Sequence, residues 1–210
     1  MKIAIIGAGH VGGTLGRAWV GKGHAVCFGV RNPQDAKVRA LLAEAGPGAT
    51  ALSVAEAAKA ADVVVLATPW SATEAAVRSA GPLDDKIVID ATNPLNEDFS
   101  ALTLGHTVSA AEQVASWAPG ARVFKAFNTT GFGNMANPQF PGGKAVMFVC
   151  GDDPEGKRTV LDLAAGIGFD AVDAGGLVQA RRLEPLAMLW ISLAFGQGFG
   201  TDFAFGLLRR

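Results

Sequence analysis

Three glycines near the N-terminus, Gly7, Gly9 and Gly12, follow the apolar run 2–6 with the spacing Gly-x-Gly-x-x-Gly. An apolar strand, a glycine turn and the start of a helix, in this order, bind the pyrophosphate of a dinucleotide. Gly7 permits the tight turn, Gly9 lets backbone approach the phosphates, and Gly12 allows the helix to pack close to the strand. Free N–H groups at the helix start then face the phosphates. The predicted contacts are Gly7, Ala8, Gly9, His10, Val11 and Gly12. The alternative is a glycine turn with a structural role alone.

The identity of the dinucleotide depends on residues 29–32, which read Gly-Val-Arg-Asn. NAD binding requires an acidic residue about 20 positions after the glycine turn, which accepts a hydrogen bond from the ribose 2′-hydroxyl. Arg31 stands there instead, and its fork of donors suits a 2′-phosphate. The sequence therefore predicts NADP(H) as the cofactor, with Val30, Arg31 and Asn32 at its adenosine end. The alternatives are that Arg31 is a solvated surface residue, or that it stacks on the adenine of NAD.

The composition is typical of a globular enzyme. The chain has 210 residues, 50% of them hydrophobic, and a formal net charge of −1. This length predicts one large domain, or one domain with a small appendage. The balanced charge argues against a nucleic-acid partner, and the scattered histidines and cysteines predict no metal site. Cys27 and Cys150 stand in apolar runs, so we expect buried free thiols in a reducing cytoplasm, with a disulfide only if the fold brings them together.

Residues 186–208 are almost free of charge, with Asp202 as the one ionisable side chain among them. Glycines interrupt the segment after Phe195, and the apolar run 186–195 is too short to cross a membrane. The N-terminal apolar run is likewise too short for a signal peptide. We therefore expect no membrane association. The C-terminal segment is predicted to be a buried helix, an oligomer interface or a wall of a ligand pocket.

Apolar strands and helical patterns alternate along the first 128 residues. Strands are predicted at 2–6, 25–28, 62–67, 86–90 and 122–127, and helices at 33–45, from a Ser53 cap to about 60, at 71–80 and at 108–117. This alternation predicts an α/β Rossmann fold, a doubly wound parallel sheet covered on both faces.

A second section follows, with a strand at 145–150, a helix capped by Asp153 that runs to about 167, a strand at 169–173 and a last helix. It is predicted to pack on the first. The expected domains are 1–128, which binds NADP, and 129–210, a small α/β section that completes the acceptor pocket.

Residues that follow the strands are candidates for ligand contacts, because the carboxyl ends of the strands line the binding crevice of this fold. The cofactor candidates are Ala67, Thr68, Pro69, Trp70 and Asn93. The substrate candidates, after the next strand, are Asn128, Thr129 and Thr130.

Several of these residues have a second interpretation. Asn93 and Asn128 either orient a nicotinamide carboxamide or a flavin carbonyl, or satisfy loop backbone. Trp70 is either a cofactor contact or packing at a helix start. Asp90 and Lys125 end strands at the crevice, where they form either a proton donor or a structural ion pair.

Several segments resemble the family of NADP oxidoreductases that depend on the deazaflavin coenzyme F-420. They occur in the family's order, at 7–12, 29–31, 67–70, 109–112, 150–153, 173–175 and 180–186. The pattern, with the run Lys-Ala-Phe-Asn-Thr at 125–129, is also similar to the oxidoreductase domain of the six-transmembrane metalloreductases. Two positions differ from the family's pattern. Val30 stands where a serine is common, and Asn128 stands where deazaflavin-using members have a histidine.

The resemblance implies hydride exchange between NADPH and a flavin-like acceptor, either a deazaflavin or FMN or FAD. The chemistry then resides in the two ring systems. The protein must hold them face to face at about 3–3.5 Å and exclude water. No catalytic side chain is assigned, and the absence of tyrosine excludes tyrosine-dependent carbonyl reduction. A homodimer is expected from the resemblance and from the uncharged C-terminal segment.

Two other functions compete with this one. The first is reduction of a small C=O or C=N bond, as in the ketopantoate and pyrroline-carboxylate reductases. Those enzymes place a long helical domain after the nucleotide domain, whereas two strands are predicted within 129–210 here. The second is a non-enzymatic redox sensor that binds NADPH and a protein partner.

Overall fold

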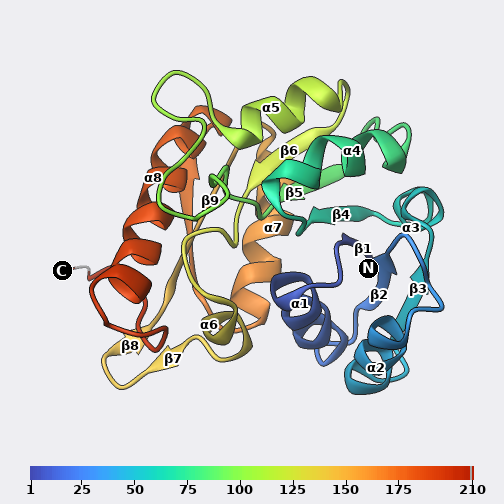
Figure 1. The fold of residues 1–210 in the computed structure, drawn as a ribbon, viewed down its shortest axis with the longest axis horizontal. Helices are drawn as coiled ribbons and strands as arrows, with labels where there is room; N and C mark the ends of the chain where they lie inside the picture. The colour runs from blue at the N-terminus through green and yellow to red at the C-terminus, as the bar shows by residue number, and fades with distance from the viewer. Residues whose placement is uncertain (209) are drawn as a thin grey trace.

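A computed structural model describes residues 1–208 and residue 210. Eight strands form one sheet in the order β10-β9-β6-β5-β4-β1-β2-β3 (Figure 1). These strands are β1 (Lys2–Ile6), β2 (Ala25–Gly29), β3 (Ala49–Leu52), β4 (Val63–Leu66), β5 (Ile87–Asp90), β6 (Arg122–Lys125), β9 (Val146–Gly151) and β10 (Asp170–Gly175). A separate hairpin consists of β7 (Gln139–Phe140) and β8 (Gly143–Lys144). The predicted Rossmann fold is confirmed.

One pair of neighbours in the sheet departs from the parallel arrangement. β9 runs antiparallel to β6, with Cys150 opposite Lys125, and β10 then runs parallel to β9. Strands from both predicted sections therefore share one sheet. The division into domains 1–128 and 129–210 stays a prediction, and its position 209 lies outside the described residues.

Helices cover both faces of the sheet because its central strands are apolar on both sides, as in β4, where every residue is buried. One core contains side chains of α1 (His10–Val20), α2 (Ala36–Ala45), α6 (Phe132–Ala136) and α7 (Pro154–Gly166). The other contains side chains of α3 (Val54–Ala60), α4 (Trp70–Ala80), α5 (Ala110–Trp117) and α8 (Ala180–Ile191). Figure 1 shows the two groups on opposite sides of the sheet.

Capping residues set where several helices begin. Ser53 and Ser109 each form a capping box with the glutamate three positions later, and Asp153 caps α7 with Pro154 at its first position. Two helices begin later than predicted. α5 begins at Ala110 because Ser109 is its cap, and α2 begins at Ala36 because the Asp35 carboxylate accepts a hydrogen bond from the Lys37 N–H.

The apolar C-terminal segment forms α8, which continues as the π-helical turn η2 (Ser192–Gly196), after the short 3₁₀ helix η1 (Leu177–Gln179). Trp190 is buried against Phe203, whereas Phe195 and Phe199 are exposed. Within the described residues, no helix has the length and apolar character needed to span a membrane. Cys150 is buried, Cys27 is half-buried, and both are free thiols.

Candidate functional site

The turn between β1 and α1 needs glycine at two of its positions. Gly7 has a φ of +114°, and a Cβ there would lie 2.5 Å from the Ala67 carbonyl oxygen. A Cβ on Gly12 would collide with the carbonyl oxygen of Gly7. A Cβ on Gly9 would instead have no neighbour within 4 Å, so the space in front of this residue is open. The turn is therefore closely packed on its protein side and open where backbone would approach a ligand.

The first turn of α1 is free to bind an anion. Gly9 is its N-cap and supplies no side-chain acceptor, and the first turn contains no acidic residue. The N–H groups of the first helical residues are therefore left without an intrahelical acceptor, and the helix dipole adds positive potential. The His10 ring stacks on Phe132 of α6 with ring centroids 4.7 Å apart. The structure thus places the imidazole against α6.

The segment after β2 presents one unpaired cation. Arg31 is exposed and makes no hydrogen bond or ion pair with the part of the chain that the structure describes. Val30 is tied to β3, since its N–H donates to the Leu52 carbonyl at 3.0 Å. The Asn32 Oδ1 accepts from the Gln34 N–H at 3.0 Å, which fixes the turn beyond Arg31. The guanidinium therefore remains available to a ligand.

A cavity of about 450 Å³ lies at the carboxyl ends of β4 and β5. It is lined by Val11 beside the glycine turn, by 67–71 after β4, by 91–93 after β5, and by 95–97 with Phe99 in the loop before α5. The structure thus brings the predicted contacts Val11, 67–70 and Asn93 to one cavity. Trp70 also stacks on Trp117 at 5.3 Å, so its ring both packs on α5 and lines the cavity.

The loop wall of this cavity was missed by the sequence analysis. Leu95 and Leu102 form a β-bridge, and the Asn96 N–H donates to the Ala101 carbonyl at 2.9 Å, so the loop is folded on itself. Phe99, at its tip, is 63% exposed and has a φ of +59°. The available signal was the length of the connection between β5 and α5, because long loops in compact domains are commonly functional.

A buried ionic cluster lies beneath the crevice. The Lys125 ammonium donates to the Asp90 carboxylate at 2.8 Å and to the Thr92 carbonyl at 2.7 Å. It also pairs with the Glu184 carboxylate at 2.8 Å, and all three charged side chains are at most 1% exposed. Glu184 in turn accepts hydrogen bonds from the N–H groups of Ala110 and of the next residue, at the start of α5.

The cluster decides between the two interpretations of Asp90 and Lys125. Burial alone would lower the pKa of Lys125, but the two carboxylates outweigh burial and raise that pKa above its ordinary value. Burial raises the pKa of the Glu184 carboxyl, while Lys125 opposes that rise. Because the ammonium already has three acceptors, it has no donor left for a substrate. The structure therefore shows a structural ion pair. Glu184 was not predicted, because it joins the cluster from α8.

Asn93 and Asn128 contact each other across the ends of β5 and β6. The Asn93 amide donates to the Asn128 carbonyl at 2.9 Å, and the Asn128 amide donates to the Asn93 Oδ1 at 3.0 Å. The Asn128 amide also donates to the Leu183 carbonyl at 3.1 Å, whereas its own Oδ1 is buried without a partner.

The other two substrate candidates are buried. Thr129 is 2% exposed, and the Thr130 hydroxyl accepts a hydrogen bond from the Asn134 amide at 2.8 Å. Neither lines the 450 Å³ cavity. Their assignment as acceptor contacts stays a prediction.

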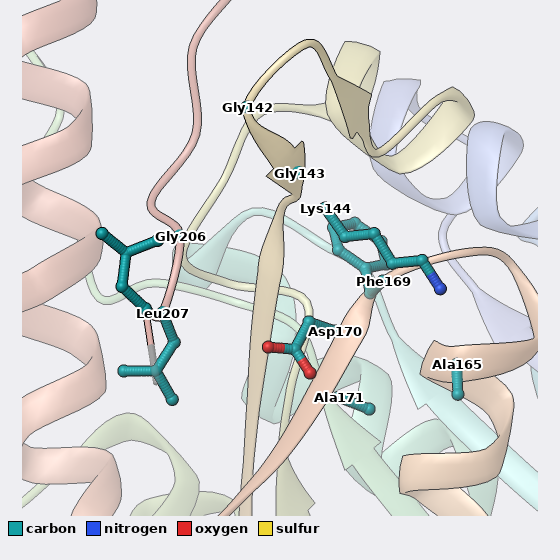
Figure 2. A pocket seen from close by; sticks show the side chains of 10 residues that line it. Gly142, Gly143, Lys144, Ala165, Phe169, Asp170, Ala171, Gly206 and Leu207 are labelled. Carbon is teal, nitrogen blue, oxygen red and sulfur yellow. The ribbon is translucent and has the colours of Figure 1, made fainter. Parts of the chain in front are cut away.

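A second hollow, of about 440 Å³, lies elsewhere on the molecule (Figure 2). Its lining consists of 142–144, Ala165, 169–171 and 206–208. Figure 2 shows Gly206 and Leu207 of the C-terminal segment on one side and the start of β10 on the other. None of the predicted site residues lies in it. Across the described part of the chain, no group of three or more His, Cys, Asp or Glu residues is placed to hold a metal ion.

The doubly wound sheet, the open glycine turn at β1–α1 and the cavity at the strand ends define the class of the protein, a Rossmann-type dinucleotide-binding protein. The family model described as NADP oxidoreductase, coenzyme F420-dependent, matches residues 2–94. The chain belongs to this family, which confirms the resemblance found in the sequence and supports NADP(H) as the cofactor.

Individual relatives agree with this membership. The chain is 29% identical over 206 residues to the F420-dependent NADP reductase of Methanocaldococcus jannaschii, and the match covers 92% of each chain. It is 32% identical over 192 residues to the metalloreductase STEAP3 of Rattus norvegicus, a match that covers 90% of this chain and 37% of that protein's length. A crystal structure from Arthrobacter sp. FB24, provisionally described as an F420-dependent NADP reductase, has a TM-score of 0.91 and 33% identity, with 100% of both chains covered.

Proposed function

We propose that this oxidoreductase transfers hydride between NADP(H), bound at the glycine turn, and a flavin or deazaflavin acceptor. The observation that carries the proposal is the shape of the turn, which is closed to any side chain at Gly7 and Gly12 but open in front of Gly9. This is the cradle that a pyrophosphate requires.

The chain's own residues have defined tasks in this proposal. Backbone N–H groups at the start of α1 bind the pyrophosphate, and the unpaired guanidinium of Arg31 binds the 2′-phosphate. Residues 67–70 and Asn93 contact the nicotinamide half, because they line the cavity that continues from Val11. Asn128, Thr129 and Thr130 lie on the acceptor side. Bound NADPH supplies the hydride, while the protein orients the two rings and excludes water.

We further propose that the acceptor is a small molecule, that the protein acts in the cytoplasm, and that it forms a homodimer. The exposed apolar side chains of the C-terminal segment, Leu189, Phe195 and Phe199, support a contact between two copies.

The test is stopped-flow oxidation of NADPH and of NADH by the purified protein, with deazaflavin F-420, FMN, FAD and riboflavin offered in turn. Fast, NADPH-specific turnover with one of these is the expected result, and it identifies the acceptor. Tight NADPH binding without turnover on any of them contradicts the proposal. That outcome favours a small C=O or C=N substrate, or a redox sensor.

A further inference from the structure

The 450 Å³ cavity has an end that the proposed NADP(H) contacts do not use. Val11 and residues 67–70 form the end beside the glycine turn, where the Ala67 carbonyl packs against the turn. Residues 95–97 and Phe99 line the cavity from the loop after β5, and β5 lies beyond β4 as counted from β1 in the sheet. A cavity of about 150 Å³ can hold one benzene ring. The loop end therefore has room for a second ring beside the nicotinamide.

Phe99 gives the loop end an aromatic surface. Its side chain lines the cavity and is nevertheless 63% exposed, so the ring is free to contact a ligand. Flat heterocycles stack on aromatic side chains, and Leu95 adds apolar surface beside Phe99. Asn128, on the acceptor side, contacts the wall of the cavity through its hydrogen bonds with Asn93. The loop end thus suits a flat, aromatic acceptor.

The loop holds Phe99 and Glu97 at the cavity before any ligand is bound. The Asn96 N–H donates to the Ala101 carbonyl at 2.9 Å, and the Ala101 N–H donates to the Asn96 Oδ1 at 3.1 Å. The Phe99 N–H donates to the Asn96 carbonyl at 3.2 Å, which fixes the tip with a φ of +59° at Phe99. Bulky residues rarely adopt this conformation, and such strain gathers where a side chain must be held for a ligand.

The charge at this end of the cavity is negative. Glu97 is the one ionisable side chain among the described residues that line it. Asp98 adds a second carboxylate, and the hydrogen bonds that it accepts from the residue two positions later lower the pKa of its carboxyl. Residues 91–109, which connect β5 to α5, contain no lysine or arginine. On α4, which begins at the cavity, Arg78 is already paired with Glu74 at 2.6 Å.

We propose that the loop end binds the acceptor ring, and that this acceptor is a flavin or deazaflavin without a phosphate, as in riboflavin, in place of FMN, FAD or coenzyme F-420. The ring stacks on Phe99 beside the nicotinamide, while Glu97 and Asp98 repel an anionic side chain. In the reaction the oxidised flavin gains the hydride of NADPH and one proton from solvent, which leaves NADP⁺. The inference rests on the proposed function and names the charge class of its acceptor.

The experiment measures steady-state oxidation of NADPH by the wild-type protein with two matched pairs of acceptors. These are riboflavin with FMN, and 5-deazariboflavin with its 5′-phosphate, so the members of each pair differ by the phosphate alone. We expect the KM of the neutral member to be about tenfold lower in both pairs, because like charges brought together weaken binding. The difference should shrink as salt is raised from about 0.01 M to about 0.1 M, where the screening length falls from about 30 Å to about 10 Å.

Two variants separate the charge of the loop from its aromatic surface. Glu97→Gln keeps the size of the side chain, and the ratio of the FMN KM to the riboflavin KM should fall toward one. Glu155→Gln is the matched control, because Glu155 is an exposed glutamate in the first turn of α7, outside the cavity, and the ratio should stay that of the wild type. Phe99→Ala should raise the KM of both flavins by about tenfold, whereas Phe99→Tyr keeps the ring and should retain the wild-type values.

Three results overturn the inference. They are a wild-type KM for FMN that equals or lies below that for riboflavin, an unchanged KM ratio in Glu97→Gln, and unchanged flavin KM values in Phe99→Ala. Failure of the proposed function looks different, because no member of either pair then oxidises NADPH, and the inference falls with it.

Discussion

Replacement of Lys125 by methionine should destabilise the protein strongly. The substitution keeps an unbranched side chain of similar length but removes the only cation of the buried cluster. Asp90 and Glu184, which are at most 1% exposed, would then be two buried carboxylates without a counter-ion. Removal of one partner from a buried pair typically costs about 3–5 kcal/mol. For a chain of this size, that loss corresponds to a fall of roughly 6–20 °C in Tm.

The pH dependence of this loss follows from the pKa of Lys125. Burial alone would lower that pKa, but Asp90 and Glu184 outweigh burial and raise the pKa above its ordinary value of 10.5. A raised pKa means that the charged lysine stabilises the fold fully below its unfolded-state pKa, and that this contribution disappears only as pH rises through the folded-state pKa. Between pH 6 and 8, where the midpoint of pH 7 lies about three and a half units below 10.5, the Lys125 contribution is therefore present in full.

The assay is urea unfolding at pH 7, followed by tryptophan fluorescence. Arg78→Met is the matched control, because it breaks the exposed ion pair with Glu74 on α4 and should cost less than about 1 kcal/mol. The double variant Lys125→Met/Asp90→Asn removes one of the two unpaired charges and should recover part of the lost stability, because the amide oxygen can still accept the hydrogen bonds from Thr92. The reasoning is refuted if Lys125→Met costs no more than Arg78→Met, or if the double variant is no more stable than Lys125→Met.

Four further predictions concern binding, reactivity and acid stability. Arg31→Ala should weaken NADPH binding by about tenfold to a hundredfold, because charge-assisted hydrogen bonds to the 2′-phosphate are lost, and should leave NADH binding nearly unchanged. Fluorescence titration measures both affinities, and an unaltered NADPH affinity contradicts the assignment of Arg31. Gly9→Ala should weaken NADPH binding without lowering Tm, since its Cβ meets no protein atom within 4 Å, whereas Gly12→Ala should lower both because its Cβ meets the backbone of the turn. Burial raises the pKa of the Cys150 thiol to about 12, so iodoacetamide at pH 8 should label it only after denaturation, and labelling of the native protein would argue against this burial. Arg181 on α8 pairs with Glu112 and holds the pKa of the Glu112 carboxyl below its ordinary 4.5. The ionised Glu112 therefore stabilises the fold above that value, and this stabilisation is lost as pH falls through the folded-state pKa. The variant Glu112→Gln should flatten the acid side of a plot of unfolding free energy against pH.

Local patterns were enough to predict the framework of the site. The spacing of Gly7, Gly9 and Gly12 predicted the turn because each glycine answers a steric requirement within a few residues of itself. The apolar runs predicted their strands because β4 and its neighbours are buried on both faces. The caps Ser53 and Asp153 were predicted for the same reason, since a cap and the N–H that it accepts are three residues apart.

Contacts between distant segments could not be predicted in this way. The orientation of β9 depends on how the chain returns to the sheet, and either orientation satisfies the same buried apolar run. The apolar segment 186–208 had three candidate roles, and the structure shows a partly buried helix with exposed aromatic residues beyond it.

The sequence by itself determined the fold class, the glycine turn and the cationic residue that follows β2, because these depend on the period and spacing of neighbouring residues. Only the tertiary structure decided the roles of Asp90 and Lys125 and the contacts of Asn128. Glu184, which completes the charge balance of Lys125, and Leu183, which orients the Asn128 amide, come from α8 more than 50 residues further along the chain. Hydrogen bonds and charge pairing act over a few ångströms, so which groups they join is known only once the chain has folded.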